Sequence, residues 1–423
     1  MELKKYKLAD IGKVITGKTP STSIAENYAW GTIPFYTPED VAKGLGMMGR
    51  NSRFISKTGF EEIASNTISG ESVLVGCIGS DMGNVAYSNI TCATNQQINA
   101  ITQFKNGIEP LYVYYLLSTM KSYFQKIAGS TTTPILPKSV FEEIEIHLPD
   151  MKKQKDVVSI LYALDRKIEL IKQIIDNLEA MAKQLYDYWF VQFDFPNEEG
   201  KPYKSSGGAM VWNEKLKREI PQGWSNGVLS DVANITMGQS PDGSSYNEDG
   251  EGIIFYQGST DFGLRFPDIR QYTTSPSRYA NKGDILMSVR APVGALNIAN
   301  NDCCIGRGLS ALSSKIGSMT HLYYLMNDFR LKFEGMNSAG TTFGSITKDE
   351  LFSLPVVIPT KSVISEFEQV CEPIFDKQMI IGEEINALTK QRDELLPLLM
   401  NGQATVNYHL SDSFTNYFLV FYP

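Results

Sequence analysis

The chain has 423 residues, about three times the length of a common domain, so we expect two or more hydrophobic cores. Its 42% hydrophobic and 20% charged residues exclude wholesale disorder and a collagen-like structure. The longest apolar stretches are far shorter than the roughly 20 residues that cross a bilayer, and the first residues lack an apolar signal core. We therefore expect a cytoplasmic protein with no membrane partner.

The charge balance leaves the class of partner open. The chain carries 39 Lys and Arg against 47 Asp and Glu, a formal net charge of −8, which at first argues against a nucleic-acid partner. Residues 361–423, however, hold four of the bases and nine of the acids. Because an acidic segment can face water while another surface binds DNA, the total charge neither establishes nor excludes that ligand. Five cysteines without a CxxC pair and three scattered histidines predict neither a disulfide framework nor a metal site.

Residues 1–150 have the pattern of a mixed α/β module. Short runs rich in β-branched and aromatic residues, Ile33–Tyr36 and Ser72–Ile78, predict strands separated by long loops. Apolar periodicity predicts a helix over Leu111–Ile127. The module ends at Leu148-Pro149, after which the periodicity changes.

Residues 151–190 predict a long helix with a heptad seam, because apolar residues recur at alternating spacings of three and four. The seam positions are Leu161, Leu164, Ile168, Ile171, Ile175, Leu178, Ala182 and Leu185. Residues 191–220 are polar and rich in Gly, Lys and Pro, and we interpret them as a structured linker.

Residues 221–360 repeat the first module. Strands are predicted at Gly252–Tyr256 and Asp284–Val289, and a helix at His321–Phe333. At an offset of 210 residues, Lys138 aligns with Lys348, and Leu148-Pro149 with Ile358-Pro359. Near the start of each copy, Leu8–Pro20 resembles Leu229–Pro241 at an offset of 221, so loop lengths differ. An internal repeat of two modules is therefore predicted.

Residues 361–403 predict a second long helix. Its seam positions are those of the first helix shifted by the same 210 residues. The corresponding positions, apolar at six of eight places, are Cys371, Ile374, Gln378, Ile381, Ile385, Leu388, Arg392 and Leu395. The simpler alternative is that each stripe is buried on its own domain. Matching phase and length favour mutual packing as an antiparallel pair. Residues 404–423 form a tail, of which Ser411–Pro423 could pack on the first module or be a dispensable extension.

One segment of the first module matches a nucleotide-binding motif. Gly12–Thr19 fits the pattern GxxxxGK[ST] of a P-loop, which would make the chain an ATPase using Lys18. The repeat disfavours it, since Ala233 and Gln239 stand where Gly12 and Lys18 stand in the first copy. Pro20 also follows at the place where a phosphate-binding helix should continue. We predict no catalytic centre in this chain.

Several segments together resemble the specificity subunits of type I restriction-modification enzymes, over Leu8 to about Val406. The segments that carry the resemblance are Tyr188–Val191, Phe193–Pro196, Gly200–Gly208, Ile220–Trp224, Ser288–Gly294, Cys304–Leu309, Gly340–Lys348 and Leu395–Gln403. Ser411–Pro423 departs from the family pattern.

The resemblance implies an α+β fold, with two similar mixed α/β target-recognition domains separated by two long antiparallel coiled-coil helices and related by a pseudo-twofold repeat. It further implies a sequence-specific DNA-recognition subunit that binds a split site in double-stranded DNA. Such a subunit docks two modification subunits, which are adenine methyltransferases, and through them restriction subunits. No cofactor is expected in this chain; S-adenosylmethionine, ATP and Mg²⁺ would bind the partners. The remaining alternative is a coiled-coil scaffold without a nucleic-acid role.

The helix length agrees with this reading. Leu161 and Leu185 are 24 residues apart, about 36 Å at roughly 1.5 Å per residue, close to the ~34 to 36 Å of one turn of B-DNA. We hypothesise that the helix pair is a molecular ruler that places two readers on one face of a duplex.

Residues suited to DNA contact occur in both modules, because Arg pairs with guanine and Asn or Gln with adenine in the major groove. Hydroxyls in Gly-Ser/Thr-Thr segments, each with a downstream lysine, suit phosphate, although turn chemistry explains them equally well. Any of the arginines could instead form ordinary surface ion pairs. The candidates are Arg50, Arg53, Asn95, Gln96, Gln97, Ser130, Thr131, Thr132 and Lys138 in the first module, and Arg265, Arg270, Arg278, Arg290, Arg307, Arg330, Thr341, Thr342 and Lys348 in the second.

Overall fold

The computed structural model describes residues 3–42, 53–79, 82–129, 134–338, 344–409 and 416–421. The chain divides into two compact units. Unit 1 comprises Met1–Ile168 and Leu388–Pro423, and unit 2 comprises Glu169–Ala387. Each unit therefore contains one module together with a segment of each long helix.

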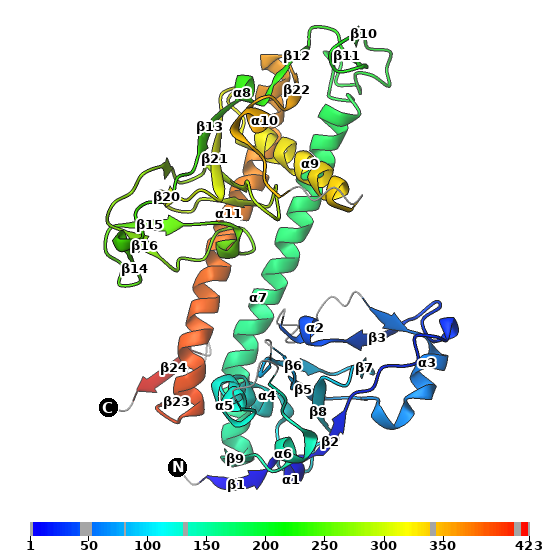
Figure 1. The fold of residues 1–423 in the computed structure, drawn as a ribbon, viewed down its shortest axis with the longest axis vertical. Helices are drawn as coiled ribbons and strands as arrows, with labels where there is room; N and C mark the ends of the chain where they lie inside the picture. The colour runs from blue at the N-terminus through cyan, green and yellow to red at the C-terminus, as the bar shows by residue number, and fades with distance from the viewer. Residues whose placement is uncertain are drawn as a thin grey trace. The chain divides into compact units, whose positions relative to one another are not determined.

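The module of unit 1 is built on a four-stranded antiparallel sheet in the order β2-β8-β5-β6 (Figure 1). Its strands are β2 (Lys13–Thr16), β8 (Ile98–Thr102), β5 (Ser72–Gly76) and β6 (Val85–Ser88). Residues of β5 alternate between the two faces, so Val73 and Val75 join the main core while Leu74 joins a second cluster on the opposite face. Helix α4 (Pro110–Ser118) contacts β5 and β6 and contributes Tyr112 to the main core.

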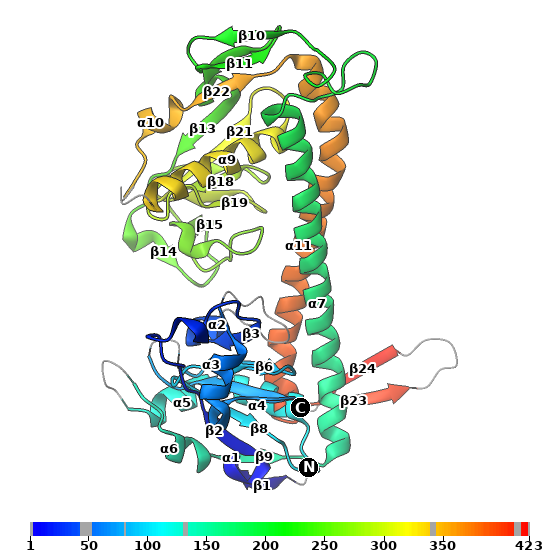
Figure 2. The same cartoon turned by 90° about the vertical axis from the view of Figure 1, so that its right-hand side faces the viewer.

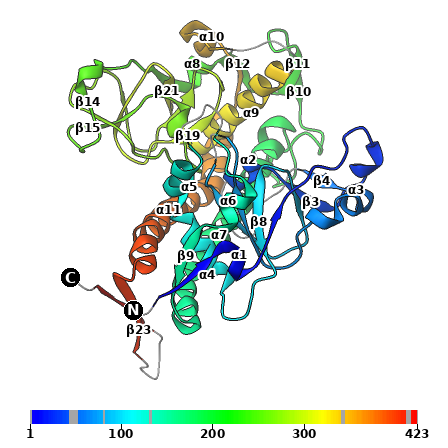
Figure 3. The ribbon, with the colours of Figure 1, turned by 60° about the horizontal axis from the view of Figure 1, so that its bottom comes forward.

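Smaller elements complete this module. Strand β1 pairs with β9, the last strand of the module, so its two ends are neighbours in space. Strand β3 pairs with β4 and, in parallel, with β7, and Figure 3 shows β3, β4 and α3 gathered together. The bounds are β1 (Lys4–Lys7), α1 (Leu8–Ile11), β3 (Ile33–Tyr36), α2 (Pro38–Ala42), β4 (Phe54–Ile55), α3 (Lys57–Glu62), β7 (Ala93–Thr94), α5 (Lys121–Ile127), α6 (Lys138–Glu142) and β9 (Glu145–Leu148).

The module of unit 2 repeats the main sheet of unit 1, which confirms the predicted repeat, whereas its second sheet has five strands, β14-β16-β15-β20-β17, in place of β4-β3-β7. Its main sheet has the order β13-β21-β18-β19, all antiparallel, as in unit 1. Strand β12 pairs with β22 as β1 pairs with β9, and β15 pairs in parallel with β20 as β3 pairs with β7. The bounds are β12 (Ser225–Val228), α8 (Leu229–Val232), β13 (Ala233–Met237), β14 (Tyr246–Asn247), β15 (Ile253–Tyr256), β16 (Tyr272–Thr273), β17 (Tyr279–Ala280), β18 (Ile285–Ser288), β19 (Leu296–Ile298), β20 (Cys303–Ile305), β21 (Leu309–Ser314), α9 (Met319–Ser338), α10 (Lys348–Phe352) and β22 (Pro355–Ile358).

Two helices, α7 (Met151–Tyr186) and α11 (Lys361–Met400), supply segments to both units. In unit 1, Leu161 of α7 shares a core with Leu395 and Leu399 of α11. In unit 2, Ala182 near the other end of α7 shares a core with Cys371. The beginning of each helix thus meets the end of the other, and the predicted antiparallel packing is confirmed within each unit (Figure 2). Among the described helices, none is both long and apolar enough to cross a membrane.

The two polar positions that interrupt the second seam are partnered rather than solvated. Gln378 has no exposed surface, and its side chain bonds to Glu179 and Arg265. Arg392 donates from Nη1 to Oδ1 of Asp165 on α7 at 3.0 Å. Buried polar groups keep their cost low when they are hydrogen-bonded, which explains how a seam apolar at only six of eight places still packs.

Some element boundaries differ from the sequence prediction. The helix predicted over Leu111–Ile127 is two helices, α4 and α5, with a break at Thr119 and Met120. The hydroxyl of Thr119 bonds to the carbonyl of Leu116, which competes with continued helix formation. The linker 191–220, predicted to be structured, contains a hairpin of β10 (Met210–Asn213) and β11 (Arg218–Pro221), whose last residue lies one position beyond the predicted end. The backbone of the tail forms a second hairpin, β23 (Ala404–His409) with β24 (Asn416–Phe421).

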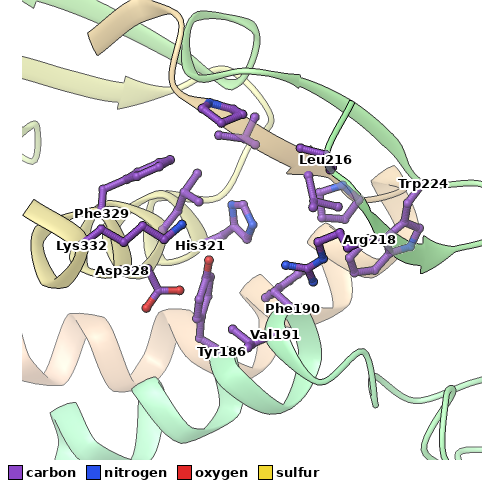
Figure 4. Close-up of a pocket in the computed structure, with 15 residues that line it drawn as sticks. Tyr186, Phe190, Val191, Leu216, Arg218, Trp224, His321, Asp328, Phe329 and Lys332 are labelled. Carbon is purple, nitrogen blue, oxygen red and sulfur yellow. The ribbon is translucent and has the colours of Figure 1, made fainter. Parts of the chain in front are cut away.

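An aromatic core in unit 2 surrounds the end of α7, where a π-helical turn spans Asp187–Val191. His321 of α9 lies in this core with 2% of its surface exposed, and its ring centroid is 4.5 Å from that of Phe190. Burial lowers the pKa of His321 to about 3, so its imidazole is neutral at pH 7. Figure 4 shows His321 beside Tyr186, on a cavity of about 230 Å³ that Arg218 and Lys332 also line.

We predict that His321 makes the stability of unit 2 depend on pH. The unfolded chain protonates this histidine below about pH 6.5, whereas the folded state does so only near pH 3, so the contribution is complete above pH 6.5 and falls as the pH decreases. The loss is on the order of 1.4 kcal/mol for each pH unit below 6.5. His321→Leu, which cannot titrate, should therefore show a flatter fall in unfolding free energy between pH 7 and 5 than the parent. Denaturant unfolding at each pH measures this, and equal slopes would contradict it.

Candidate nucleic-acid interface

Three loops of unit 2 meet beyond one end of the β13-β21-β18 sheet, and we call them loop cluster 2: residues 238–240, 288–291 and 306–308. The N–H of Gly238 donates to the carbonyl of Leu309 at 2.9 Å, and the N–H of Val289 donates to the carbonyl of Gly308 at 2.9 Å. The N–H of Gln239 donates to the carbonyl of Ile305 at 3.0 Å. Main-chain bonds therefore connect all three loops to one another or to the ends of the adjoining strands.

Two further segments extend loop cluster 2. The N–H of Ile346 donates to the carbonyl of Val289 at 3.0 Å, so residues 344–346 run beside 289–291. The N–H of Ile305 donates to the carbonyl of Arg278 at 2.9 Å. As a result, Arg278, Arg290 and Arg307, which are far apart in the sequence, lie on segments that are bonded to one another. All three are exposed.

Unit 1 contains the same arrangement, which we call loop cluster 1: residues 17–19, 76–79 and 95–97. Gly17 donates to the carbonyl of Ile98 at 3.0 Å, and Cys77 donates to that of Gln97 at 2.8 Å. Leu136 donates to the carbonyl of Cys77 at 2.9 Å, as Ile346 does to Val289. Each of these bonds has its counterpart in loop cluster 2, so the two clusters share one backbone framework.

Glycine is required where the loops approach most closely. A Cβ on Gly238 would lie 2.1 Å from the carbonyl oxygen of Gly306, and one on Gly17 would lie 2.2 Å from that of Asn95. Gly308 is similarly confined, with a Cβ 2.6 Å from the carbonyl oxygen of Gln257. Gly17, which belongs to the nucleotide-motif match in the sequence, thus serves backbone packing, as Gly238 and Gly308 do.

The side chains on the two frameworks differ. Where loop cluster 2 has Arg307 between two glycines, loop cluster 1 has Gln96 between Asn95 and Gln97. Asn95 donates from Nδ2 to Oε1 of Gln97 at 2.9 Å, which fixes these two amides against each other. Gln96 is exposed, and its Oε1 accepts from the hydroxyl of Thr19 at 2.9 Å. One framework therefore presents guanidinium groups and the other presents amides.

Arg265 does not belong to this surface, which corrects its selection as a DNA-contact candidate. Only 6% of Arg265 is exposed, and its guanidinium bonds to Glu179 and Gln378. It also lies over the rings of Tyr323 and Phe375 at 4.9 and 4.8 Å. Arg265 is inaccessible to a duplex in this structure.

The other candidates either contact neighbouring groups of the protein or lie outside the described residues. Arg270 is exposed but bonds to the carbonyl of Thr260, Arg330 bonds to Asn327, and Arg53 lies 3.9 Å from Glu39. Lys138 forms an ion pair with Glu142 at 3.5 Å, and Lys348 lies over the ring of Phe352. The candidates that fall outside the described residues are Arg50, Ser130, Thr131, Thr132, Thr341 and Thr342.

The P-loop interpretation is wrong. Residues Lys13–Thr16, which would have to wrap a phosphate, form strand β2 and pair with β8. The next helical turn is a 3₁₀ turn at Ala25–Asn27, so no helix begins after Thr19 to present its N–H groups to a nucleotide.

The sequence reasoning missed several members of the clusters. Gln239 lies in loop cluster 2, and Ser277 lies on a segment bonded to it, since the hydroxyl of Ser277 donates to the carbonyl of Gln239. Ser240 accepts from the N–H of Arg307 at 3.3 Å, as Thr19 contacts Gln96 in unit 1. The internal repeat indicates the correspondence of Thr19 and Ser240, because Thr19-Pro20 aligns with Ser240-Pro241.

The chain is similar to known proteins over most of its length. The model of the type I restriction modification DNA specificity domain matches residues 1–180 and 221–394. The MjaIX specificity subunit of Methanocaldococcus jannaschii is 29% identical over 420 residues, covering 95% of this chain and 93% of that protein. The putative MjaX specificity subunit of the same organism is 33% identical over 310 residues, covering 71% and 70%. The type I restriction-modification S subunit from M. genitalium has a similar fold, with a TM-score of 0.57 at 15% identity over 94% and 96% of the two chains.

We predict that both clusters depend on their close-approach glycines. Gly17→Ala and Gly238→Ala should each lower the free energy of unfolding by about 1–3 kcal/mol, because the added methyl group meets a backbone oxygen that cannot move independently. Gly243→Ala is the matched control, since no atom lies within 4 Å of its Cβ position. Denaturant titration of the three variants measures the effect, and equal losses at all three sites would argue against it.

Proposed function

Since the chain belongs to the family of type I restriction-modification DNA specificity subunits, we propose that it recognises a DNA site in two parts, with one part read by each module. The observation that carries the proposal is that one backbone framework is built twice with different side chains. A reader of two unlike half-sites needs this combination, because the framework sets the approach to the groove while exposed side chains select the bases.

The side chains suggest what each cluster reads. Arg278, Arg290 and Arg307 offer forked donors that match the O6 and N7 acceptors of guanine. Gln96, with Asn95 and Gln97 beside it, offers amides that match the N6 and N7 groups of adenine. We propose Arg290 and Arg307 as the main base-reading residues of loop cluster 2 and Gln96 as the main one of loop cluster 1.

A surface of unit 2 supports the docking of protein partners. Leu170, Ile174, Met181 and Tyr188 are exposed large apolar residues in the second half of α7 and in the turn that follows it. Their spacings of four, seven and seven residues give a stripe at helical spacing. An exposed apolar stripe of this kind is typical of a protein interface. We propose that it docks a modification subunit, that the internal repeat provides for a second copy, and that restriction subunits join through these partners.

On this proposal the chain itself is not catalytic. The adenine methyltransferase partners would bind S-adenosylmethionine, and the restriction subunits would bind ATP and Mg²⁺. A scaffold without DNA binding is the competing function, and it predicts that the assembled complex does not retain DNA.

The proposal can be tested by co-purifying the full chain with its modification subunits and sequencing the methylated sites of a host genome. The expected result is one split motif, two defined half-sites separated by a gap of fixed length. A continuous motif, or no sequence preference in an assembled and active complex, would refute the proposal.

We further predict that arginine loss acts on one half-site. Arg290→Ala and Arg307→Ala should each weaken binding of the cognate duplex by about 1 to 3 kcal/mol and relax the base preference within one half-site only. Lys217→Ala, which removes an exposed cation from the linker hairpin, is the control. Binding titrations on duplexes with single substitutions provide the measurement. An equal loss on every sequence would reassign the arginines to phosphate contacts.

A further inference from the structure

We propose that Glu179 and Arg265 are positioning residues that fix the second recognition module on α7 and α11, and that this joint limits the gap length accepted between the two half-sites. The inference rests on the proposed function, because a gap has meaning only if each module reads one half-site. Neither residue lies in the loop clusters that present side chains to DNA.

The joint is centred on one carboxylate oxygen. Oε2 of Glu179 accepts from Nη1 of Arg265 at 3.2 Å, from the hydroxyl of Tyr324 at 3.2 Å and from Nε2 of Gln378 at 3.1 Å. Arg265 lies on a loop of the module, Tyr324 on α9, and Gln378 on α11. A single group of α7 therefore connects the module to both long helices.

Arg265 closes this network. Its Nη2 donates to Oε1 of Gln378 at 2.8 Å, and its guanidinium lies over the rings of Tyr323 and Phe375. The N–H of Ile298, at the end of β19, donates to its carbonyl at 3.1 Å, which ties the same residue to the module's main sheet. A buried cation depends on its paired carboxylate and on its hydrogen bonds. Nη1 and Nη2 of Arg265 are bonded, whereas Nε has no hydrogen-bond partner among the described residues, so the two terminal nitrogens fix the guanidinium.

The neighbouring apolar contact cannot provide the same restriction. Phe266, next to Arg265, packs at Gly382 of α11, where a Cβ would lie 2.7 Å from its ring. Apolar burial is non-directional and tolerates small sliding movements of the loop along the helix. Charge-assisted hydrogen bonds are directional, and several converge on one carboxylate oxygen here. The polar network therefore determines the register of the module on the helices, whereas Phe266 contributes mainly to its attachment.

Unit 1 contains a corresponding joint. Tyr115 of α4 is the repeat equivalent of Tyr324, since the pair Tyr114-Tyr115 aligns with Tyr323-Tyr324. The hydroxyl of Tyr115 donates to Oδ2 of Asp165 on α7 at 2.6 Å, and Oδ1 of that carboxylate accepts from Arg392 of α11 at 3.0 Å. In both units a module tyrosine thus bonds to a carboxylate of α7 that is also linked to α11. The cation comes from the module in unit 2 and from α11 in unit 1, so the two joints agree in arrangement and not in sequence.

The experiment uses the full chain assembled with its modification subunits and reads the gap lengths of methylated genomic sites. Arg265→Met keeps the aliphatic stem and removes every donor, and Glu179→Gln removes the charge with little change in size. Both should raise methylation at sites whose gap differs by one base pair from that of the parent, by about tenfold if the joint contributes as much as one base contact. The preferred bases of each half-site should not change.

Lys282→Met is the matched control. Lys282 also connects the module to α11, through Glu383 at 3.4 Å, but both side chains are exposed. An exposed pair contributes little, so the gap preference of this variant should equal that of the parent.

The outcomes separate positioning from simple stabilisation. If Arg265→Met and Glu179→Gln lower thermal stability while the gap preference stays that of the parent, the two residues are only structural and the proposal is overturned. If Arg265→Met does not assemble, Tyr324→Phe removes a single hydroxyl from the same carboxylate. It should broaden the gap preference less but in the same direction, and an unchanged preference would again overturn the inference. A parent complex without a split motif would instead refute the proposed function.

Discussion

The packing of α7 against α11 is the constraint on which the rest of the structure depends. In unit 1 the core of the module is continuous with this packing, since Val73 and Tyr112 share a cluster with Leu161 and Leu395. In unit 2 the aromatic core around the end of α7 includes Tyr324 of the module. Neither module could be separated from the helices without exposing part of its core to water, at a cost that grows with the apolar area exposed.

The seam and the repeat could be predicted from the sequence because both are expressed in local spacing. Leu161 and its partners recur at three and four residues, and the second copy repeats the phase. The polar interruptions could not be interpreted in the same way. The partner of Gln378 is Arg265, 113 residues away, and no local pattern indicates that these two side chains meet. Charged residues are almost never fully buried unless they are paired. Because the sequence indicates no partner for Arg265, it predicts that this side chain lies on the surface.

The candidate site was predictable in its residue types but not in its geometry. Arg290, Arg307 and Gln96 were selected because their side chains match base edges, whereas the bonds that bring their loops together are between main-chain groups. Main-chain bonds leave almost no trace in composition. The one sequence signal for them is the pair of glycines, Gly17 and Gly238, and in the first copy Gly17 also falls within a match to a nucleotide-binding motif. Only the structure shows that Gly17 follows a strand and meets a carbonyl oxygen.

The pairing of the first and last strands of each module has a consequence for how such chains can change. Lys4 stands opposite Leu148 in one module, and Ser225 stands opposite Ile358 in the other. Because entry and exit lie side by side, a whole module behaves as a cassette whose replacement leaves the neighbouring helices continuous. Recombination between related genes at these two strands could therefore exchange a complete module in one event, provided that the new module keeps the side chains that pack against α7 and α11.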